Sequence, residues 1–379
     1  MPRFPRRAAC GVLAAAVLAG TSLRAQSASP AAPTPPEAQA RLERVRAQIF
    51  GSADGIKNAV PELKAILALD PNLAEAHMLL GVAYRGLGTD ALTGEAKAEL
   101  QQAVDLDPGL VAARLMLAQV YFDLGRYESA RDEATTALQL VPGQPQFLAV
   151  LAEAERHLGN PTRALALSNL AIQADGRLPQ ARYYRGLALI DLGRRDEGIQ
   201  QLQEVTNGGV VAPEVYLHLG AALTDAGRLD DAIAALAFGA KLGTGTREIR
   251  IELARAYRLK GSLLLADQQL TLATSAPGNV QVTSGYQRLE TALSRERGLL
   301  RLRQARLPAA AEALQAAITM DPADGPSHQG LAEVYLRQGL LPKAREEAAL
   351  AASLGAPLPA NLQQRLGVTS PGTAEKGRE

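Results

Sequence analysis

Apolar residues recur along the chain at helical spacing, and glycine interrupts this pattern at regular intervals. The segment 111–142 contains one complete unit. Its first apolar stripe consists of Leu117, Val120, Tyr121 and Leu124. Its second stripe consists of Ala130, Ala134, Ala137 and Leu138. Spacings of three and four residues predict an α-helix for each stripe. Gly125 separates the stripes and is expected to end the first helix, because glycine adopts the left-handed conformation without steric strain.

The glycine between the two helices belongs to a series with a period of 34 residues. Its members are Gly125, Gly159, Gly193, Gly227 and Gly261. Ala305 and Gly339 continue the interval of 34 after a gap of 44, which indicates a ten-residue insertion. A small residue lies seven positions before each member, as Ala118 does before Gly125. This pattern predicts stacked helix–turn–helix repeats, because one hairpin is too thin to bury its own apolar faces.

The repeat unit resembles the tetratricopeptide repeat (TPR). In segment 111–142 the matching residues are Leu117, Ala118, Tyr121, Gly125, Ala130, Ala137 and Pro142. The last unit matches with Leu331, Ala332, Tyr335, Gly339, Ala344 and Ala351. The resemblance implies an all-α fold, a right-handed α-solenoid of about eight to nine TPR helix–turn–helix repeats. In the seventh copy Arg297, Gly298 and Arg301 replace the usual residues, so its first helix is expected to be extended or shifted.

The N-terminus has the pattern of a secretory signal peptide. Three arginines within residues 1–7 precede the apolar run 8–20, and small residues lead to an expected cleavage after Ala25. An uncleaved anchor or an incorrect start codon is the alternative. Cleavage leaves 36 basic against 39 acidic residues and removes Cys10, the single cysteine, which suits an oxidising compartment. The protein is therefore expected to be periplasmic or secreted.

The remaining boundaries follow from composition and from the repeats. Residues 26–36 are rich in Pro and Ala and are expected to form a linker. A degenerate N-terminal repeat is expected at 37–73 and the TPR array at 74–358, with eight copies starting at Ala74. Residues 359–379 are expected to form a C-terminal cap helix followed by a disordered tail.

Charge and chemistry then exclude several function classes. The chain has 40 Lys+Arg and 39 Asp+Glu residues, and this balance argues against a nucleic-acid binder. The four histidines are His77, His157, His218 and His328. They lie in different copies without metal-binding spacing, so no metal and no cofactor are expected. No nucleophile or phosphate-binding motif precedes a helix in the required context, which predicts a non-enzyme with no catalytic residues.

The sequence Asn207–Gly208–Gly209 is rich in glycine but lies between two predicted helices. It is interpreted as a loop and not as a phosphate-binding site, because no strand precedes it. Gly209 lies outside the 34-residue series, and it is expected to tolerate substitution better than Gly193 does.

The TPR resemblance implies a concave groove that is lined by the first helix of each repeat and binds partner segments. Three positions in each first helix face this groove: three residues before, one after and four after the small residue. The candidates are Leu115, Gln119, Phe122, Tyr183, Leu187, Ile190, Leu217, Ala221, Thr224, Ile251, Arg255 and Arg258. The groove is expected to be apolar in its middle and basic further along, at Arg255 and Arg258. The alternative is that some of these residues pack against neighbouring helices.

A second candidate surface is the basic segment 288–306. Its arginines are Arg288, Arg295, Arg297, Arg301, Arg303 and Arg306, against two glutamates. It is either a solvated helix face or a binding patch for an acidic partner, an anionic glycan or a lipid surface.

Two functions remain open at this stage. The first is a non-enzymatic scaffold of the bacterial cell envelope that binds other proteins or peptides in its groove. The alternative is an accessory subunit of a machine for envelope polysaccharide synthesis, export or degradation, with the basic segment contacting glycan or enzyme. No nucleic acid and no membrane span of the mature chain are expected in either case.

Overall fold

The computed structural model describes residues 36–49, 53–88, 90–242, 246–274 and 284–367. The predicted signal peptide 1–25, nearly all of the predicted linker and the tail from residue 368 lie outside the described residues. None of the helices in the described part of the chain is both long enough and apolar enough to span a bilayer.

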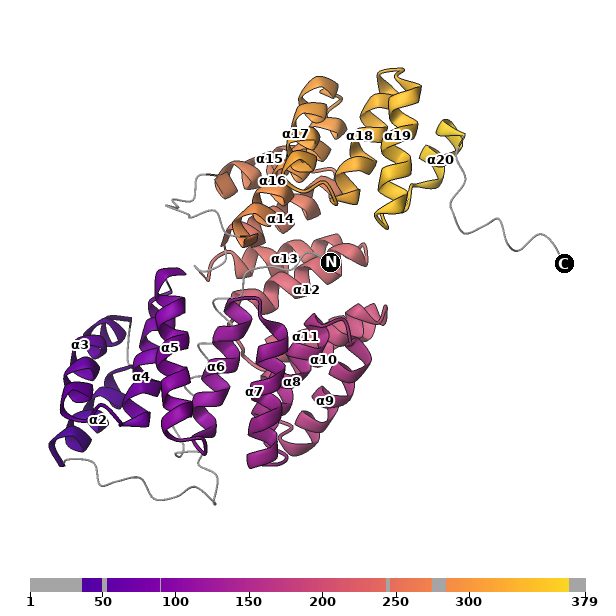
Figure 1. Ribbon diagram of the computed structural model, residues 1–379. Helices are drawn as coiled ribbons and strands as arrows, with labels where there is room; N and C mark the ends of the chain where they lie inside the picture. The colour runs from indigo at the N-terminus through magenta and orange to yellow at the C-terminus, as the bar shows by residue number, and fades with distance from the viewer. Residues whose placement is uncertain (1–35, 50–52, 89, 243–245, 275–283, 368–379) are drawn as a thin grey trace. The chain divides into compact units, whose positions relative to one another are not determined.

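Within these ranges the chain folds into 19 helices and no strand. Figure 1 labels these helices along the chain. The first nine are α2 (Pro36–Ile49), α3 (Ala53–Leu69), α4 (Ala74–Leu87), α5 (Asp90–Leu106), α6 (Val111–Asp123), α7 (Tyr127–Leu140), α8 (Pro145–His157), α9 (Pro161–Ala174) and α10 (Pro179–Asp191). The others are α11 (Arg195–Asn207), α12 (Pro213–Asp225), α13 (Leu229–Gly239), α14 (Thr246–Lys260), α15 (Leu263–Thr274), α16 (Ser284–Arg303), α17 (Leu307–Met320), α18 (Gly325–Arg337), α19 (Leu341–Ser353) and α20 (Ala360–Leu366). From α4 to α19 they form eight pairs of a first and a second helix, and α2 with α3 forms a ninth. The predicted fold class is confirmed.

The described residues divide into two compact units, which we call the N-terminal unit (36–218) and the C-terminal unit (219–367). In the N-terminal unit one continuous core runs from α2 to α8 and consists mainly of Leu, Ala and Val. In the C-terminal unit separate clusters lie between consecutive hairpins, and α20 contributes Leu362 and Leu366 to the last of them. Stacking of neighbouring hairpins thus supplies the burial that a single hairpin lacks.

The glycines of the 34-residue series end the first helices as expected. Gly125, Gly193 and Gly261 have φ values of 71°, 78° and 87°, which lie in the left-handed region. The next backbone N–H closes the helix end, as where Arg194 N donates to Leu189 O at 2.9 Å. Ala305 occupies the same place with φ 59° and is the single non-glycine residue with positive φ among the described residues.

One expectation about glycine is wrong. Gly209 also has a positive φ, 82°, because it ends α11, the second helix of its hairpin. A side chain there would be strained as it would be at Gly193, although Gly209 lies outside the series. The loop interpretation holds for Gly208 and Gly209, which form the turn after α11, whereas Asn207 is the last residue of that helix.

The small residues seven positions earlier have a separate function in packing. A Cβ atom added to Gly220 would lie 2.3 Å from Leu236 Cγ, and one added to Gly298 would lie 2.5 Å from Leu314 Cγ. Glycine therefore lets the first and second helices of these hairpins approach closely. The seventh copy keeps this close approach of its two helices at Gly298. Its first helix, α16, is extended to 20 residues, as the sequence indicated.

Candidate functional site

Most candidate groove residues of the N-terminal unit are buried. Leu115, Phe122 and Tyr183 are 0%, 5% and 7% exposed, and Leu187 and Leu217 are 4% and 5% exposed. Leu115 and Phe122 belong to the continuous core of this unit. This burial favours the packing alternative for these side chains over an open binding surface.

Further candidates of the first helices are also largely buried. Gln119 is 2% exposed, and its Oε1 accepts a hydrogen bond from Arg85 Nη1 at 3.1 Å. Thr224 is 3% exposed and Ile251 2%, whereas Ile190 and Ala221 are half-buried. Position in the first helix therefore does not by itself make a side chain accessible.

Arginine–carboxylate pairs connect successive first helices in the N-terminal unit. Arg85 Nε of α4 lies 2.7 Å from Asp123 Oδ2 of α6, and Arg156 Nη1 of α8 lies 3.1 Å from Asp191 Oδ2 of α10. Both arginines lie four residues after the small residue of their repeat, and both aspartates lie five after theirs. Partly buried pairs of this kind fix how one hairpin stacks on the next.

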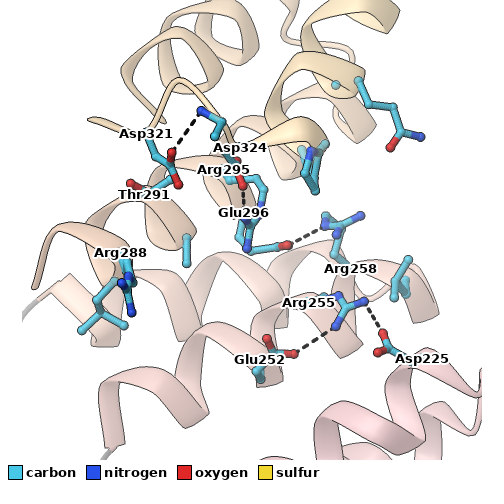
Figure 2. Close-up of a pocket in the computed structure, with 18 of the residues that line it drawn as sticks. Asp225, Glu252, Arg255, Arg258, Arg288, Thr291, Arg295, Glu296, Asp321 and Asp324 are labelled. Carbon is cyan, nitrogen blue, oxygen red and sulfur yellow. Dashed lines mark hydrogen bonds and ion pairs between the residues drawn. The ribbon is translucent and has the colours of Figure 1, made fainter. Parts of the chain in front are cut away.

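The C-terminal unit contains an open groove of about 830 Å³, which is shown in Figure 2. Its walls come from α14, α16 and α18, from the end of α12 and from the turn at residues 321–324. Its apolar lining includes Leu259, Leu289, Ala292, Leu299, Ala323 and Pro326. Leu259 is 45% exposed, so part of this apolar surface is open to a partner.

The charged lining of this groove is more acidic than basic. The acids are Asp225, Glu252, Glu296, Asp321, Asp324 and Glu333, and the bases are Arg255, Arg258, Arg288 and Arg295. Six carboxylates against four guanidinium groups give the lining a formal charge of −2. Arg255 and Arg258 do line the groove, but the expectation that they make it basic is wrong.

Both Arg255 and Arg258 form ion pairs with acids on neighbouring helices. Arg255 binds Asp225 of α12, and its Nη1 lies 3.3 Å from Glu252 Oε2 of its own helix, as the dashed lines in Figure 2 indicate. Arg258 Nε lies 2.9 Å from Glu296 Oε2 of α16. The pairs thereby link three first helices, and neither arginine is an unpaired cation.

Arg295 continues this network towards α18. Its Nη1 lies 2.6 Å from Asp324 Oδ1, and the Ser327 hydroxyl donates to the other oxygen of Asp324. Asp324 and Ser327 are 8% and 0% exposed. A buried carboxylate with two such partners holds the 321–324 turn against α16.

Burial changes the acid–base properties of two groups in this network. It raises the pKa of Glu252, and the nearby Glu296 carboxylate raises it further against the opposing effect of Arg255. Burial alone would lower the pKa of Arg255, but Glu252, Asp225 and Glu296 together raise it above its ordinary value. Arg255 therefore stays charged, and Glu252 is held less firmly as an anion than an exposed glutamate is.

The basic segment 288–306 does not form one surface. Arg288 and Arg295 line the groove, whereas Arg301 Nη2 lies 3.0 Å from Asp267 Oδ1 of α15. Arg297 Nη2 donates to Thr274 Oγ1 at 2.6 Å, and Arg303 and Arg306 are exposed near the end of α16 and at the start of α17. A helix turns by about 100° per residue, so neighbours in sequence point in different directions. The expectation of a single basic patch is therefore wrong.

The acids of the groove were missed because they lie at other offsets from the small residue. Asp225 lies five residues after Gly220, and Glu296 lies two before Gly298. The aspartate at this offset recurs as Asp123 and Asp191. That recurrence is the sequence signal that could have pointed to Asp225, whereas Glu296 has no counterpart at its offset among these pairs.

In the described part of the chain no group of three or more His, Cys, Asp or Glu side chains is placed to hold a metal ion. His77 and His328 instead bridge helices, with Nδ1 2.6 Å from a carboxylate oxygen of Glu99 and Glu347 respectively. The second ring nitrogen of each faces a proline carbonyl, at 3.0 Å and 3.1 Å. These contacts are structural.

The fold and the groove define an α-helical repeat protein built from two-helix units. A family model described as tetratricopeptide repeat matches residues 93–154, and a second with the same description matches 183–238 and 295–359. These segments are thus similar to tetratricopeptide repeats, and the helix pairs of the described residues match those of TPR solenoid structures. No curated protein matches the sequence.

A solved structure shows the same fold. A chain of the APC/C hetero-tetramer Cut9–Hcn1 superposes with a TM-score of 0.68 at 14% identity, over 86% of this chain and 61% of that chain. This protein thus spans less than two thirds of the length of that relative. PilF of Pseudomonas aeruginosa matches with a TM-score of 0.47 at 19% identity, over 59% of this chain and 97% of its own. A MamA structure matches with a TM-score of 0.37 at 23% identity, over 44% of this chain and 94% of its own.

Proposed function

We propose that this protein is a non-enzymatic scaffold that binds segments of partner proteins in the groove of its C-terminal unit. The observation that carries the proposal is the groove of about 830 Å³ between α14, α16 and α18, with apolar and charged residues on its walls. Concave surfaces that combine apolar anchors with a few fixed polar groups are the usual binding sites of proteins. The TPR fold supports this function, because it presents its first helices as a surface for other chains.

We place the scaffold in the bacterial cell envelope. The basic, apolar and small-residue sequence of 1–25 supports export, and a mature chain without cysteine supports an oxidising compartment. The alternative of a polysaccharide-machine subunit depended on one basic surface. Because the six arginines of 288–306 divide between the groove, contacts with α15 and exposed positions, they do not form the single surface that would support it.

Site-specific photocrosslinking in cells of the source organism tests the groove. A photoreactive phenylalanine analogue at Leu259, which lines the groove and is 45% exposed, should crosslink to a discrete partner. The same analogue at Glu312, an exposed residue of the second helix α17, is the matched control. Discrete crosslinks at Glu312 and none at Leu259 would place the partner on another face and refute the proposal.

A further inference from the structure

We propose that the groove of the C-terminal unit binds a basic segment of a partner protein, whose lysine or arginine side chains supply the positive charge that the groove lacks. This rests on the proposed function, because it specifies the chemistry of the segment bound at the same site. It departs from the expectation from the sequence that the groove is basic at Arg255 and Arg258.

The first argument is the charge balance at the base of the groove. Glu252, Glu296 and Asp324 are 5%, 3% and 8% exposed, and Asp225 completes the set of acids that hold arginines there. These four carboxylates face three guanidinium groups, those of Arg255, Arg258 and Arg295. The network is therefore one positive charge short.

The second argument is that three of the four lining arginines are already paired with acids of the groove, whereas Asp321 is not paired with any described arginine. Asp321 makes no ion pair with a described residue, and its Oδ1 accepts a hydrogen bond from the backbone N–H of Ala323 at 3.0 Å. Glu333 pairs with Arg337, a residue outside the lining. An acidic segment would meet paired guanidinium groups and the unpaired carboxylate of Asp321, whereas a basic one would meet favourable charge. Arg288 is the one lining arginine without an ion pair to a described residue, and it does not offset the excess.

The third argument is the apolar surface between the charges. Leu259, Leu289 and Leu299 line the same groove as the acids. A segment that alternates apolar and basic residues would therefore match both features, because apolar contacts supply affinity and charge supplies orientation and selectivity.

Fluorescence anisotropy with defined probes tests this chemistry on the full mature chain. Three labelled peptides of equal length alternate leucine with lysine, with glutamate or with glutamine. We expect the Leu/Lys peptide to bind most tightly and the Leu/Glu peptide most weakly. Asp225→Asn and Glu333→Gln should each weaken Leu/Lys binding about threefold to tenfold and reduce its salt dependence. Glu312→Gln, on an exposed face away from the groove lining, should leave it unchanged.

The outcomes separate this inference from the proposed function. Leu259→Ser should weaken whichever peptide binds in the groove. If the Leu/Glu peptide binds best and depends on Leu259, the groove is a binding site but the basic-segment proposal is overturned. If Glu312→Gln weakens Leu/Lys binding as much as Asp225→Asn does, the attraction is diffuse and the proposal again fails. If no peptide depends on Leu259, both proposals fail. Melting curves of each variant verify that it is folded, and Glu333→Gln replaces Asp225→Asn if the latter is not.

Discussion

The glycine that ends a first helix offers a direct test of how the sequence specifies this fold. Gly193 has φ 78°, and a Cβ atom added there would meet nothing within 4 Å. A side chain at this position would therefore cost backbone strain alone, with no steric clash to confuse the result. Gly193→Val should lower the free energy of unfolding by about 1–3 kcal/mol, since a β-branched residue is especially disfavoured in the left-handed region.

Two further variants make the comparison quantitative. Gly94 lies inside α5 without a positive φ, and a Cβ atom there also meets nothing within 4 Å. Gly94→Ala should therefore raise the free energy of unfolding by about 0.5–1 kcal/mol. Ala305 has φ 59° at the equivalent helix end, so Ala305→Gly should relieve strain and stabilise by a similar amount of about 0.5–1 kcal/mol.

Urea denaturation followed by circular dichroism measures all three variants against the parent chain. The reasoning requires opposite signs for Gly193→Val and Gly94→Ala. Two outcomes would refute this reasoning: both variants shift the midpoint in the same direction, or Ala305→Gly destabilises the protein. Either would show that the glycines are not placed at the helix ends to avoid backbone strain. Gly209 is not a suitable control, because its φ of 82° predicts a loss of stability like that at Gly193.

The fold was predictable because its determinants are local and periodic. A left-handed glycine at each helix end, and a small residue where two helices meet, act within a single hairpin and recur at 34 residues. Even Ala305, which breaks the glycine rule, keeps the same helix end, because Arg306 N still donates to Arg301 O at 2.9 Å. The surrounding hairpin thus holds alanine in a conformation that alanine disfavours on its own.

The site was predictable only in part, because its charge depends on pairs between repeats. The offsets placed Arg255 and Arg258 in the groove, and both line it. Their partners Asp225 and Glu296 come from the preceding and following repeats, 30 and 38 residues away. A count of charges along one helix does not include them. The burial of Phe122 could not be predicted either. Its position in the first helix does not indicate which side chains of neighbouring helices cover it.

The remaining predictions concern export, the buried aromatic residue and one buried acid. Mass spectrometry of the mature N-terminus should find Gln26 first, and a full-length form would refute cleavage after Ala25. Phe122→Ala should cost about 3–5 kcal/mol of stability in urea denaturation, because Phe122 is 5% exposed, and an unchanged midpoint would refute its place in the core. The last concerns Glu214, whose two carboxylate oxygens are buried without a hydrogen-bond partner among the described residues. Burial raises the pKa of Glu214 in the folded protein. The unfolded chain therefore loses this proton at a lower pH than the folded protein does. The folded state consequently loses stability as the pH rises from the ordinary glutamate pKa to the raised one. Glutamine occupies the equivalent position as Gln146 and Gln180 in the two preceding repeats, so the site accepts an amide. Glu214→Gln should therefore match the parent chain in acid, where the glutamate is protonated in both states, and melt at a higher temperature at neutral pH. A constant difference across the pH range, or a lower melting temperature at neutral pH, would show that Glu214 is not held as a desolvated acid.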